Sequence, residues 1–325
     1  MNSLTFPILH LLSDGRFRSG EALAAHFGVT RATIWNALQD AESHGVRLFS
    51  VRGKGYRLPE PVSFLDREQL RALLADHANI YALEIHECMD STNSYLMRAA
   101  AEGAAHASCV IAELQTAGRG RRGRAWQTGL GDSLTFSVLW RFDCGAGALS
   151  GLSLAVGVAL MRALHELGAT EAQLKWPNDI VSNGKKLAGI LIELQGDMDG
   201  ASAAVIGIGL NLRVSEEMRR AIAQPAAGLQ ELLDTEVPRD VVLATLLRHL
   251  ADVLAIFERN GFEPLRDEWI ARHAYHNDVV RLLLPDGREI DGIAQDVAAD
   301  GALLVRAAEG LRRFTSGEVS LRVIA

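Results

Sequence analysis

Apolar and polar positions follow three different patterns along the chain. Between residues 65 and 270, apolar runs of strand length alternate with longer segments whose apolar residues recur at helical spacing. Strands are expected at 82–89, 108–115, 132–140 and 203–213, helices at 66–77, 90–103, 150–168 and 238–261, and a hairpin-rich stretch at 172–195. The segment 150–168 is apolar nearly all round, which predicts a buried helix.

The first 60 residues have the pattern of a helix-turn-helix. A short helix at 19–27 begins at the capping residue Ser19 and ends at Gly28, and a second helix follows the cap Thr30 and ends at Gly45. Two short strands around a Gly-Lys-Gly turn then suit a winged variant.

This unit is expected to bind DNA, the alternative being a small helical domain for protein contacts. Thr30, Arg31 and Thr33 suit phosphates and base edges, and Asn36 suits a base edge. Arg52 and Lys54 of the wing complete the expected DNA-binding set. Residues 1–60 carry seven Lys/Arg and five acids. A monomer should therefore bind weakly, and a dimer would be needed.

The last 50 residues form a third pattern of short strands. Asp-Gly turns at 286–287 and 300–301 are typical of a small all-β barrel. The Pro-containing stretch 59–64 has the composition of a linker. The expected domains are 1–62, 63–272 and 273–325.

The bulk properties exclude several classes of protein. The net charge of −7 over 325 residues argues against a protein that coats nucleic acid through its overall charge. Cys88, Cys109 and Cys144 are far apart and have neither disulfide-framework nor zinc spacing. No targeting segment and no membrane-length apolar run is recognised, so a cytoplasmic location without membrane contact is expected.

Residues 117–126, "AGRGRRGRAW", contain the spacing G-x-G-x-x-G. A dinucleotide-binding turn would need a helix to begin within the motif, but a Gly-broken loop and a strand pattern follow. A solvated basic loop without a ligand is the plain alternative. Four arginines within six residues repel one another unless an anion balances them, and guanidinium groups suit phosphate and carboxylate. The stretch therefore predicts an anion-binding loop that orders around its ligand.

Other polar residues of the central segment have both a plain and a functional interpretation. "DSTNS" at 90–94 places Ser91, Thr92 and Asn93 at a helix start, where capping explains one polar side chain but not three. The Asn-Gly hairpin should bring Lys175, Asp179 and Lys186 together, although each lysine alone could be a solvated surface charge. Motifs for a serine, cysteine or zinc hydrolase are missing, so the reaction need not pass through the protein covalently.

These motifs together resemble the biotin–protein ligases, specifically the bifunctional kind that also represses biotin synthesis genes. The resemblance covers nearly the whole chain, through "SGEALAAHFGVTRATIW", "GKGYRL", "STNSYL", "QTAGRGRRGRAW", "KWPND", "KLAGILIEL", "GIGLNL" and "FTSGEVSLR". It implies an α+β multidomain fold with a winged helix-turn-helix, a central mixed α/β ligase domain of the class II aminoacyl-tRNA synthetase-like type, and a C-terminal SH3-like β-barrel.

The resemblance also implies the reaction. ATP would activate biotin to biotinyl-5′-AMP, and a lysine of a biotin carrier protein would then take the biotinyl group. Biotinyl-AMP would favour a homodimer that binds operator DNA. A regulator without ligase activity and a ligase for lipoate are the alternatives.

Site residues follow from the resemblance position by position. The biotin site would comprise Ser91, Thr92, Asn93, Gln115, Arg119, Gly120, Arg121 and Lys186. The nucleotide site would comprise Arg119, Arg121, Arg124, Trp126, Lys175, Asn178 and Asn211. Arg121 and Lys186 would act in catalysis, and Asp179 would bind Mg²⁺.

Overall fold

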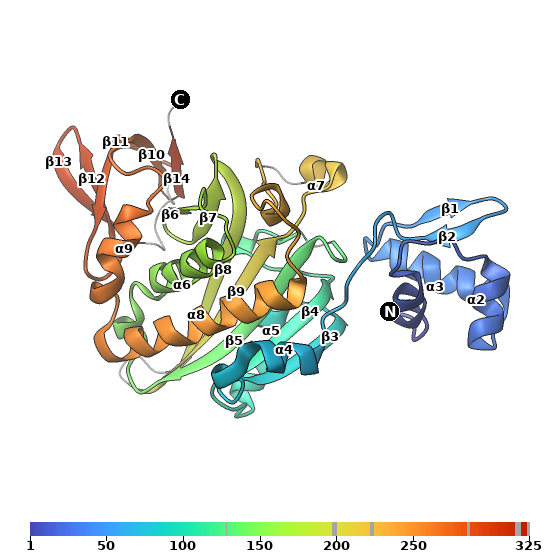
Figure 1. The fold of residues 1–325 in the computed structure, drawn as a ribbon. Helices are drawn as coiled ribbons and strands as arrows, with labels where there is room; N and C mark the ends of the chain where they lie inside the picture. Colours follow the sequence, from blue (N-terminus) through green and yellow to red (C-terminus); the bar gives the residue numbers. More distant parts are fainter. Residues whose placement is uncertain (128, 197–199, 222–223, 285–286, 316–319, 324–325) are drawn as a thin grey trace.

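The computed structural model describes residues 1–325 except 128, 197–199, 222–223, 285–286, 316–319 and 324–325. Three β-sheets organise the described residues: one of two strands near the N-terminus, one of seven in the centre and one of five near the C-terminus (Figure 1).

The N-terminal head is a winged helix-turn-helix whose helices and strands lie between Thr5 and Arg57, as expected. Its elements are α1 (Thr5–Leu12), α2 (Gly20–Phe27), α3 (Arg31–Ser43), β1 (Phe49–Val51) and β2 (Gly55–Arg57). The sequence analysis did not include α1, which supplies Ile8, Leu9 and Leu12 to a core shared with α2 and α3.

Local chemistry sets the boundaries of the head's helices. Ser19 Oγ accepts a hydrogen bond from Ala22 N at 3.0 Å, and Thr30 Oγ1 accepts one from Thr33 N at 3.2 Å. These side chains satisfy backbone donors that have no partner in the first turn of a helix. Gly28 ends α2 with φ 64°, a left-handed conformation that glycine adopts without strain.

The central sheet has the order β3-β4-β5-β9-β8-β7-β6, with β3 parallel to β4 and the remaining pairs antiparallel. Its strands are β3 (Ala82–Met89), β4 (Ser108–Gln115), β5 (Ser133–Phe142), β6 (Gln173–Lys175), β7 (Asp179–Ser182), β8 (Lys185–Gly196) and β9 (Ser202–Asn211). These bounds confirm the expected strands and the hairpin at Asn183-Gly184.

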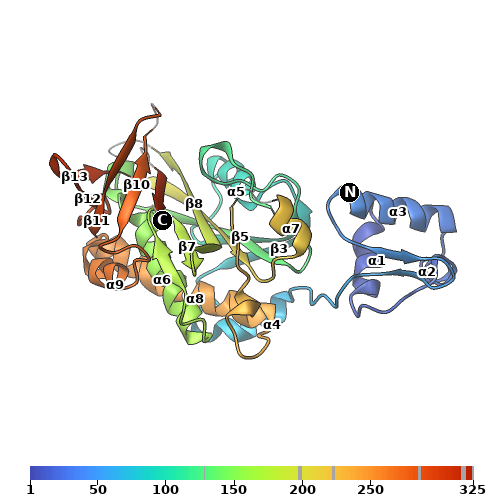
Figure 2. The same cartoon turned by 90° about the horizontal axis from the view of Figure 1, so that it is seen from above.

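Helices cover both faces of this sheet (Figures 1 and 2). The helices α4 (Arg67–Leu74), α6 (Leu152–Glu166) and α8 (Arg239–Asn260) pack on the large core and share one face. The opposite face carries α5 (Thr92–Ala101), which packs on Val110, Leu139 and Val205. Over the described residues one segment, Ala146–Glu166, is long and apolar enough to cross a membrane, but 67% of its apolar 18-residue window is buried in the fold. It is a core helix, as expected for 150–168.

The two-residue period of β9 places the cavity described below. Ile206, Ile208 and Leu210 face the large core under α6 and α8. On the opposite face Val205 packs on α5, and beyond the start of α5 this face continues with Gly207 and Gly209. Glycines replace bulky side chains where the helix no longer covers the sheet, so a hollow forms there.

The C-terminal sheet has the order β13-β12-β11-β10-β14, all antiparallel. It comprises β10 (Val279–Leu283), β11 (Glu289–Val297), β12 (Leu303–Ala307), β13 (Gly310–Phe314) and β14 (Ser320–Val323), preceded by the short helix α9 (Arg266–Ala271). The turn at 300–301 joins β11 to β12. The turn at 286–287 and the motif "FTSGEVSLR" lie partly outside the described residues. Another short helix, α7 (Glu216–Ala221), was not expected.

Specific contacts connect the head to the centre. Arg47 Nη2 lies 2.9 Å from Asp132 Oδ2, and Leu130 is buried in the apolar cluster of the head. The connecting segment is anchored by Glu113, which accepts a hydrogen bond from Leu65 N at 2.6 Å and pairs with Arg239 at 2.8 Å.

Candidate active site

A cavity of about 770 Å³ opens on the face of the central sheet beside the start of α5. Its floor is formed by β8 and β9, one end by the start of α5, and its cover by the arginine loop, residues 117–126. The volume is in the range of a site for a drug-sized ligand. Every residue expected to bind biotin or nucleotide lines it: Ser91, Thr92, Asn93, Gln115, Arg119, Gly120, Arg121, Arg124, Trp126, Lys175, Asn178, Asp179, Lys186 and Asn211.

The arginine loop is folded back on itself as a narrow hairpin. Gly120 N donates to Arg124 O at 2.7 Å and Trp126 N donates to Gly118 O at 2.9 Å, around the short 3₁₀ turn Arg121–Gly123. A Cβ on Gly118 would lie 2.5 Å from Trp126 O, so this position needs glycine. Where the sequence predicted a loop that orders around an anion, the structure shows backbone hydrogen bonds that define its shape.

Cations gather at one end of the cavity. Among the described residues, the lining includes six cationic side chains, Arg119, Arg121, Arg122, Arg124, Lys175 and Lys186, and a single carboxylate, Asp179. Burial, together with the neighbouring Arg122, lowers the pKa of Arg121. Such an excess of positive charge in a partly dry pocket favours a polyphosphate.

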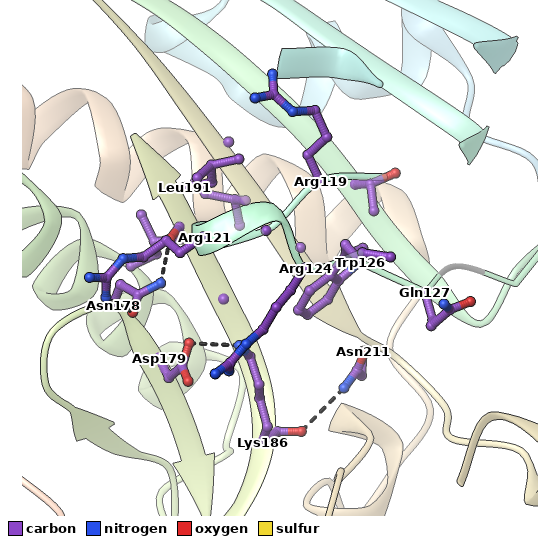
Figure 3. Close-up of a pocket in the computed structure, with 18 of the residues that line it drawn as sticks. Arg119, Arg121, Arg124, Trp126, Gln127, Asn178, Asp179, Lys186, Leu191 and Asn211 are labelled. Atoms are coloured by element: carbon purple, nitrogen blue, oxygen red, sulfur yellow. Dashed lines mark hydrogen bonds and ion pairs between the residues drawn. The ribbon is translucent and has the colours of Figure 1, made fainter. Parts of the chain in front are cut away.

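The Asn-Gly hairpin brings Lys186 to this end, as expected. Lys186 Nζ lies 2.7 Å from Asp179 Oδ1, and Lys186 O accepts a hydrogen bond from Asn211 Nδ2 at 3.2 Å (Figure 3). Arg121 Nη1 donates to Asn178 Oδ1 at 2.9 Å. Protein neighbours therefore hold both cations in place.

The opposite end of the cavity is neutral and polar. Ser91, Thr92 and Asn93 are all buried at the N-terminus of α5. Ser91 caps the helix, with Ser94 N donating to its Oγ at 3.4 Å. Gln115 Oε1 accepts from Thr92 N at 2.8 Å. Buried hydrogen-bonding groups of this kind suit a small uncharged polar ring.

Two residues at this end were missed in the sequence. Ser137 on β5 is fully buried, with its Oγ 2.7 Å from Thr92 Oγ1 and 2.6 Å from Asn93 Oδ1. Glu193 on β8 lies 3.0 Å from Asn93 Nδ2 and 2.8 Å from Arg119 Nη2. Alternation along the strands places both on the face of the cavity, a signal available once the sheet register is known.

Arg119 differs from the other arginines of the loop. Its guanidinium pairs with Glu193 and donates to Ser94 Oγ at 3.3 Å. In Figure 3 its side chain points away from Arg121, Arg124 and Lys186. The geometry therefore favours Arg121 and Arg124 over Arg119 for the expected contacts with the ligand carboxylate and phosphate.

Trp126 lies flat against the glycines of the floor. A Cβ on Gly209 would lie 2.3 Å from the indole, and one on Gly189 would lie 3.1 Å from it. Lys186 Nζ is 5.5 Å from the centre of the ring. A flat aromatic surface beside a cationic cluster is suited to a purine that carries phosphate.

The lining does not form a metal site by itself. Within the described part of the chain, no three His, Cys, Asp or Glu side chains are grouped to hold a metal ion. Asp179 is already paired with Lys186. Because Mg²⁺ takes six oxygen ligands, phosphates and water would have to supply most of them here.

The residues expected to contact DNA lie on the exposed surface of the head. Arg31, Asn36, Arg52 and Lys54 are exposed, and Arg31 forms a loose surface pair with Glu21 at 3.1 Å. The Thr30 hydroxyl caps α3 and lies 2.9 Å from Thr33 Oγ1. Trp35, also on α3, is 53% exposed, which is unusual for so large an apolar side chain.

Comparison with known families divides the chain into three matches. Residues 85–211 match the biotin/lipoate A/B protein ligase family, residues 5–57 match an HTH domain, and residues 276–322 match the biotin protein ligase C-terminal domain.

Similar proteins cover the whole chain. The bifunctional ligase/repressor BirA of Salmonella typhimurium is 38% identical over 99% of both chains, and that of Escherichia coli is 37% identical over 99% of this chain and 98% of its own. The biotin–[acetyl-CoA-carboxylase] ligase of Mycobacterium tuberculosis is 36% identical over 74% of this chain and 89% of its own.

Among solved structures, the biotin protein ligase of Aquifex aeolicus in complex with biotin and ATP superposes with a TM-score of 0.64. It is 29% identical and covers 74% of this chain and 99% of its own.

Proposed function

Because the chain belongs to the family of bifunctional ligase/repressors, we propose that it activates biotin with ATP, transfers it to a lysine of a carrier protein, and represses transcription of biotin synthesis genes. One observation carries the ligase function. The same cavity joins a neutral polar end, suited to the biotin ring, to a cationic end with an aromatic surface, suited to ATP.

The reaction needs two partial steps without an enzyme nucleophile. The biotin carboxylate oxygen attacks the α-phosphorus of ATP, the bond to the β-phosphate oxygen breaks, and pyrophosphate leaves. The amine of the carrier lysine, after losing its proton, then attacks the acyl carbon of biotinyl-5′-AMP, and AMP leaves. The chain's own groups position the reactants and offset charge on the phosphate oxygens.

Individual residues supply these effects. In this proposal Lys186, which pairs with Asp179 at 2.7 Å, neutralises charge where carboxylate and α-phosphate meet. Arg121, held by Asn178, covers this junction from the arginine loop and retains the reactive adenylate. Arg124 and Lys175 line the cationic end and balance the remaining phosphates, and Trp126 and Asn211 hold the adenine nucleoside.

Mg²⁺ enters, in this proposal, as its complex with ATP. Asp179 contributes at most one ligand, because its other neighbour is the Lys186 ammonium group. The positive charge of the bound ion would weaken the repulsion between the phosphates of ATP and the biotin carboxylate at the cationic end. Asp179→Asn should therefore raise the Mg²⁺ concentration needed for half-maximal rate if this assignment is right.

The repressor function rests on the head and requires a homodimer. The α3 residues Arg31 and Asn36 and the wing residues Arg52 and Lys54 present exposed groups to DNA. Their small total charge favours binding by two copies, which biotinyl-AMP would promote. We assign the head to residues 1–62, the ligase unit to 63–272 and the C-terminal sheet to 273–325, in a cytoplasmic protein.

Biotin-dependent exchange of labelled pyrophosphate into ATP tests activation directly. Exchange with biotin but not with lipoate supports the assignment, and a preference for lipoate would replace it. A regulator without ligase activity would bind biotinyl-AMP yet fail to label a carrier.

Gel-shift titration on biotin-gene promoter DNA, with and without biotin and ATP, tests the repressor. If the protein failed to bind this DNA both with and without biotin and ATP, the head would have only a structural role.

A further inference from the structure

A carboxylate outside the cavity lining connects the two segments that enclose the neutral end. Glu193 of β8 accepts a hydrogen bond from Asn93 of α5 and forms a two-point ion pair with Arg119 of the arginine loop, with distances of 2.8 Å and 3.1 Å to its two oxygens. Its side chain is 21% exposed. The helix start and the loop are far apart in sequence, and this group holds both.

The hydrogen bonds of Asn93 show what its contact with Glu193 achieves. The amide nitrogen donates to Glu193 Oε2 at 3.0 Å and to Leu191 O at 3.3 Å, so both protons are used. The amide oxygen receives the Ser137 hydroxyl at 2.6 Å. Asn93 is 3% exposed, so an amide turned the other way would face buried acceptors with its own oxygen.

The orientation of Asn93 is passed on to groups that do face the ligand. Ser137 Oγ also lies 2.7 Å from Thr92 Oγ1, and Thr92 contacts Gln115 through both its backbone nitrogen and its hydroxyl. Gly207 lies directly under Asn93, since a Cβ there would be 2.0 Å from Asn93 Oδ1. The amide therefore fits in one place and orders a chain of buried hydrogen bonds.

The ion pair performs a second task at the root of the arginine loop. Arg119 pairs with Ala125 across the neck of the hairpin, so fixing its side chain on β8 fixes both strands of the neck. Two parallel N–H···O contacts give this pair a defined direction as well as attraction. The pair also neutralises Arg119, which lies apart from the cations of the phosphate end in Figure 3.

We infer that Glu193 is a positioning residue of the biotin site: one carboxylate oxygen orients Asn93 and thereby the ring-binding hydroxyls, while the pair with Arg119 holds the arginine loop closed over the adenylate. The inference rests on the proposed ligase function and deepens it. The contact with Asn93 affects biotin binding and the pair with Arg119 affects retention of the adenylate, so substitutions can separate the two effects.

Two variants of Glu193 and one of Arg119 separate the two tasks. Glu193→Ala removes both contacts, so biotin KM should rise about tenfold, and the half-life of enzyme-bound biotinyl-AMP should fall by about the same factor. Glu193→Gln keeps an amide oxygen for Asn93, so biotin KM should stay within about twofold while the half-life still falls. Arg119→Ala should behave like Glu193→Gln. The melting temperature should change little in all three.

The outcomes that overturn the inference are specific. Wild-type values in Glu193→Ala would show that the carboxylate positions nothing. An equal rise of biotin KM in Glu193→Gln and Glu193→Ala would show that only the charge of Glu193 matters. A rise of biotin KM that parallels a fall in melting temperature would show a merely structural role. Glu166→Gln, which removes an exposed ion pair with Arg248, is the matched control and should leave every parameter unchanged.

Direct titration with biotin keeps this inference separate from the proposed function. If the wild-type enzyme gave no biotin-dependent exchange, the ligase function would fail. Calorimetric titration of the same variants with biotin would still judge Glu193, because binding needs no chemistry. Binding weakened in Glu193→Ala and retained in Glu193→Gln supports the orientation of Asn93, and equal binding in both contradicts it.

Discussion

Two glycines of β9 determine the shape of the cavity as much as the charged groups do. Gly207 and Gly209 alternate with the buried Ile206, Ile208 and Leu210 along β9. Asn93 lies over the first glycine and Trp126 over the second. The motif "GIGLNL" therefore combines a core face with a flat floor, and a single added methyl group would obstruct the floor.

Replacement of Gly209 by alanine tests this directly. The new Cβ would lie 2.3 Å from the indole of Trp126, so the ring must leave the floor. KM for ATP should rise about tenfold, while KM for biotin should change much less, because one aromatic contact contributes about 0.5–1.5 kcal/mol beyond its buried area. Gly147→Ala is the matched control, since no atom lies within 4 Å of its Cβ position. An unchanged KM for ATP would separate Trp126 from the nucleotide.

The buried side chain of His273 should make the stability of the fold depend on pH. Burial lowers the pKa of His273 from 6.5 to about 4, with a smaller contribution from His276. Neither ring nitrogen has a hydrogen-bond partner among the described residues. Between pH 6.5 and 4 the unfolded chain binds a proton here that the folded chain does not, so stability is full above 6.5 and falls as the pH falls.

The loss from this group should reach about 2 kcal/mol between pH 7 and pH 5. His273→Phe removes the titrating group but can keep the ring between Trp269 and Tyr275. The fall in melting temperature from pH 7 to pH 5 should therefore be smaller in the variant than in the wild type. Equal falls would show that His273 does not contribute.

At the scale of elements, the arginine loop and the wing each depend on a few backbone positions. The loop is a hairpin whose neck is closed at Gly118 and Gly120 and whose tip carries Arg121 and Arg122. Because Arg121 reaches Asn178 on the opposite side of the cavity, it closes the loop over the phosphate end.

Arg121→Gly should separate activation from retention. Biotin-dependent pyrophosphate exchange should persist, but biotinyl-AMP should dissociate faster by at least tenfold, because a half-buried charge-assisted hydrogen bond of about 1.5–3 kcal/mol is lost. The released adenylate would label bystander lysines, which mass spectrometry of an added inert protein detects. Retention equal to the wild type would contradict the role given to Arg121.

The wing depends on Gly55. Its φ is 98°, and a Cβ there would lie 2.0 Å from Arg18 O, where Arg18 and Tyr56 exchange two backbone hydrogen bonds of 2.9 Å. Gly55→Ala should destabilise the wing by at least 1–3 kcal/mol, roughly the cost of one strained residue, and should weaken promoter DNA binding. Carrier biotinylation is the control, since no wing residue lines the cavity. Normal DNA affinity in this variant would exclude the wing from the DNA contact.

The elements of the fold were largely predictable because their signals are local. Caps at Ser19 and Thr30 and the period of β9 are written in the sequence itself. The helix α1 was missed because its apolar residues have no sequence cap, and Leu4 at its N-cap position makes no side-chain hydrogen bond. Glu193 and Ser137 were missed for another reason. Their partners are on α5 and in the arginine loop, and only the folded chain brings them together.

The whole molecule links a DNA-binding head to the cavity through a short stretch of chain. Trp126 lies in the cavity, while Leu130 and Asp132, a few residues later, contact the head. Burial raises the pKa of Asp132, and the nearby Arg47 opposes this shift. The net charge of −7 places the anion-binding and DNA-binding surfaces against an acidic background, so both functions depend on local rather than overall charge.

We propose that this cavity joins biotin to a carrier lysine through an adenylate. Incubation with biotin, ATP, Mg²⁺ and a biotin carrier domain, followed by mass spectrometry of the intact carrier, measures it most directly. We expect one biotinyl group on one lysine with release of AMP and pyrophosphate, and a loss of about 10²–10³ in rate for Lys186→Ala. A carrier that stays unmodified while the protein still binds biotin and ATP would contradict the claim.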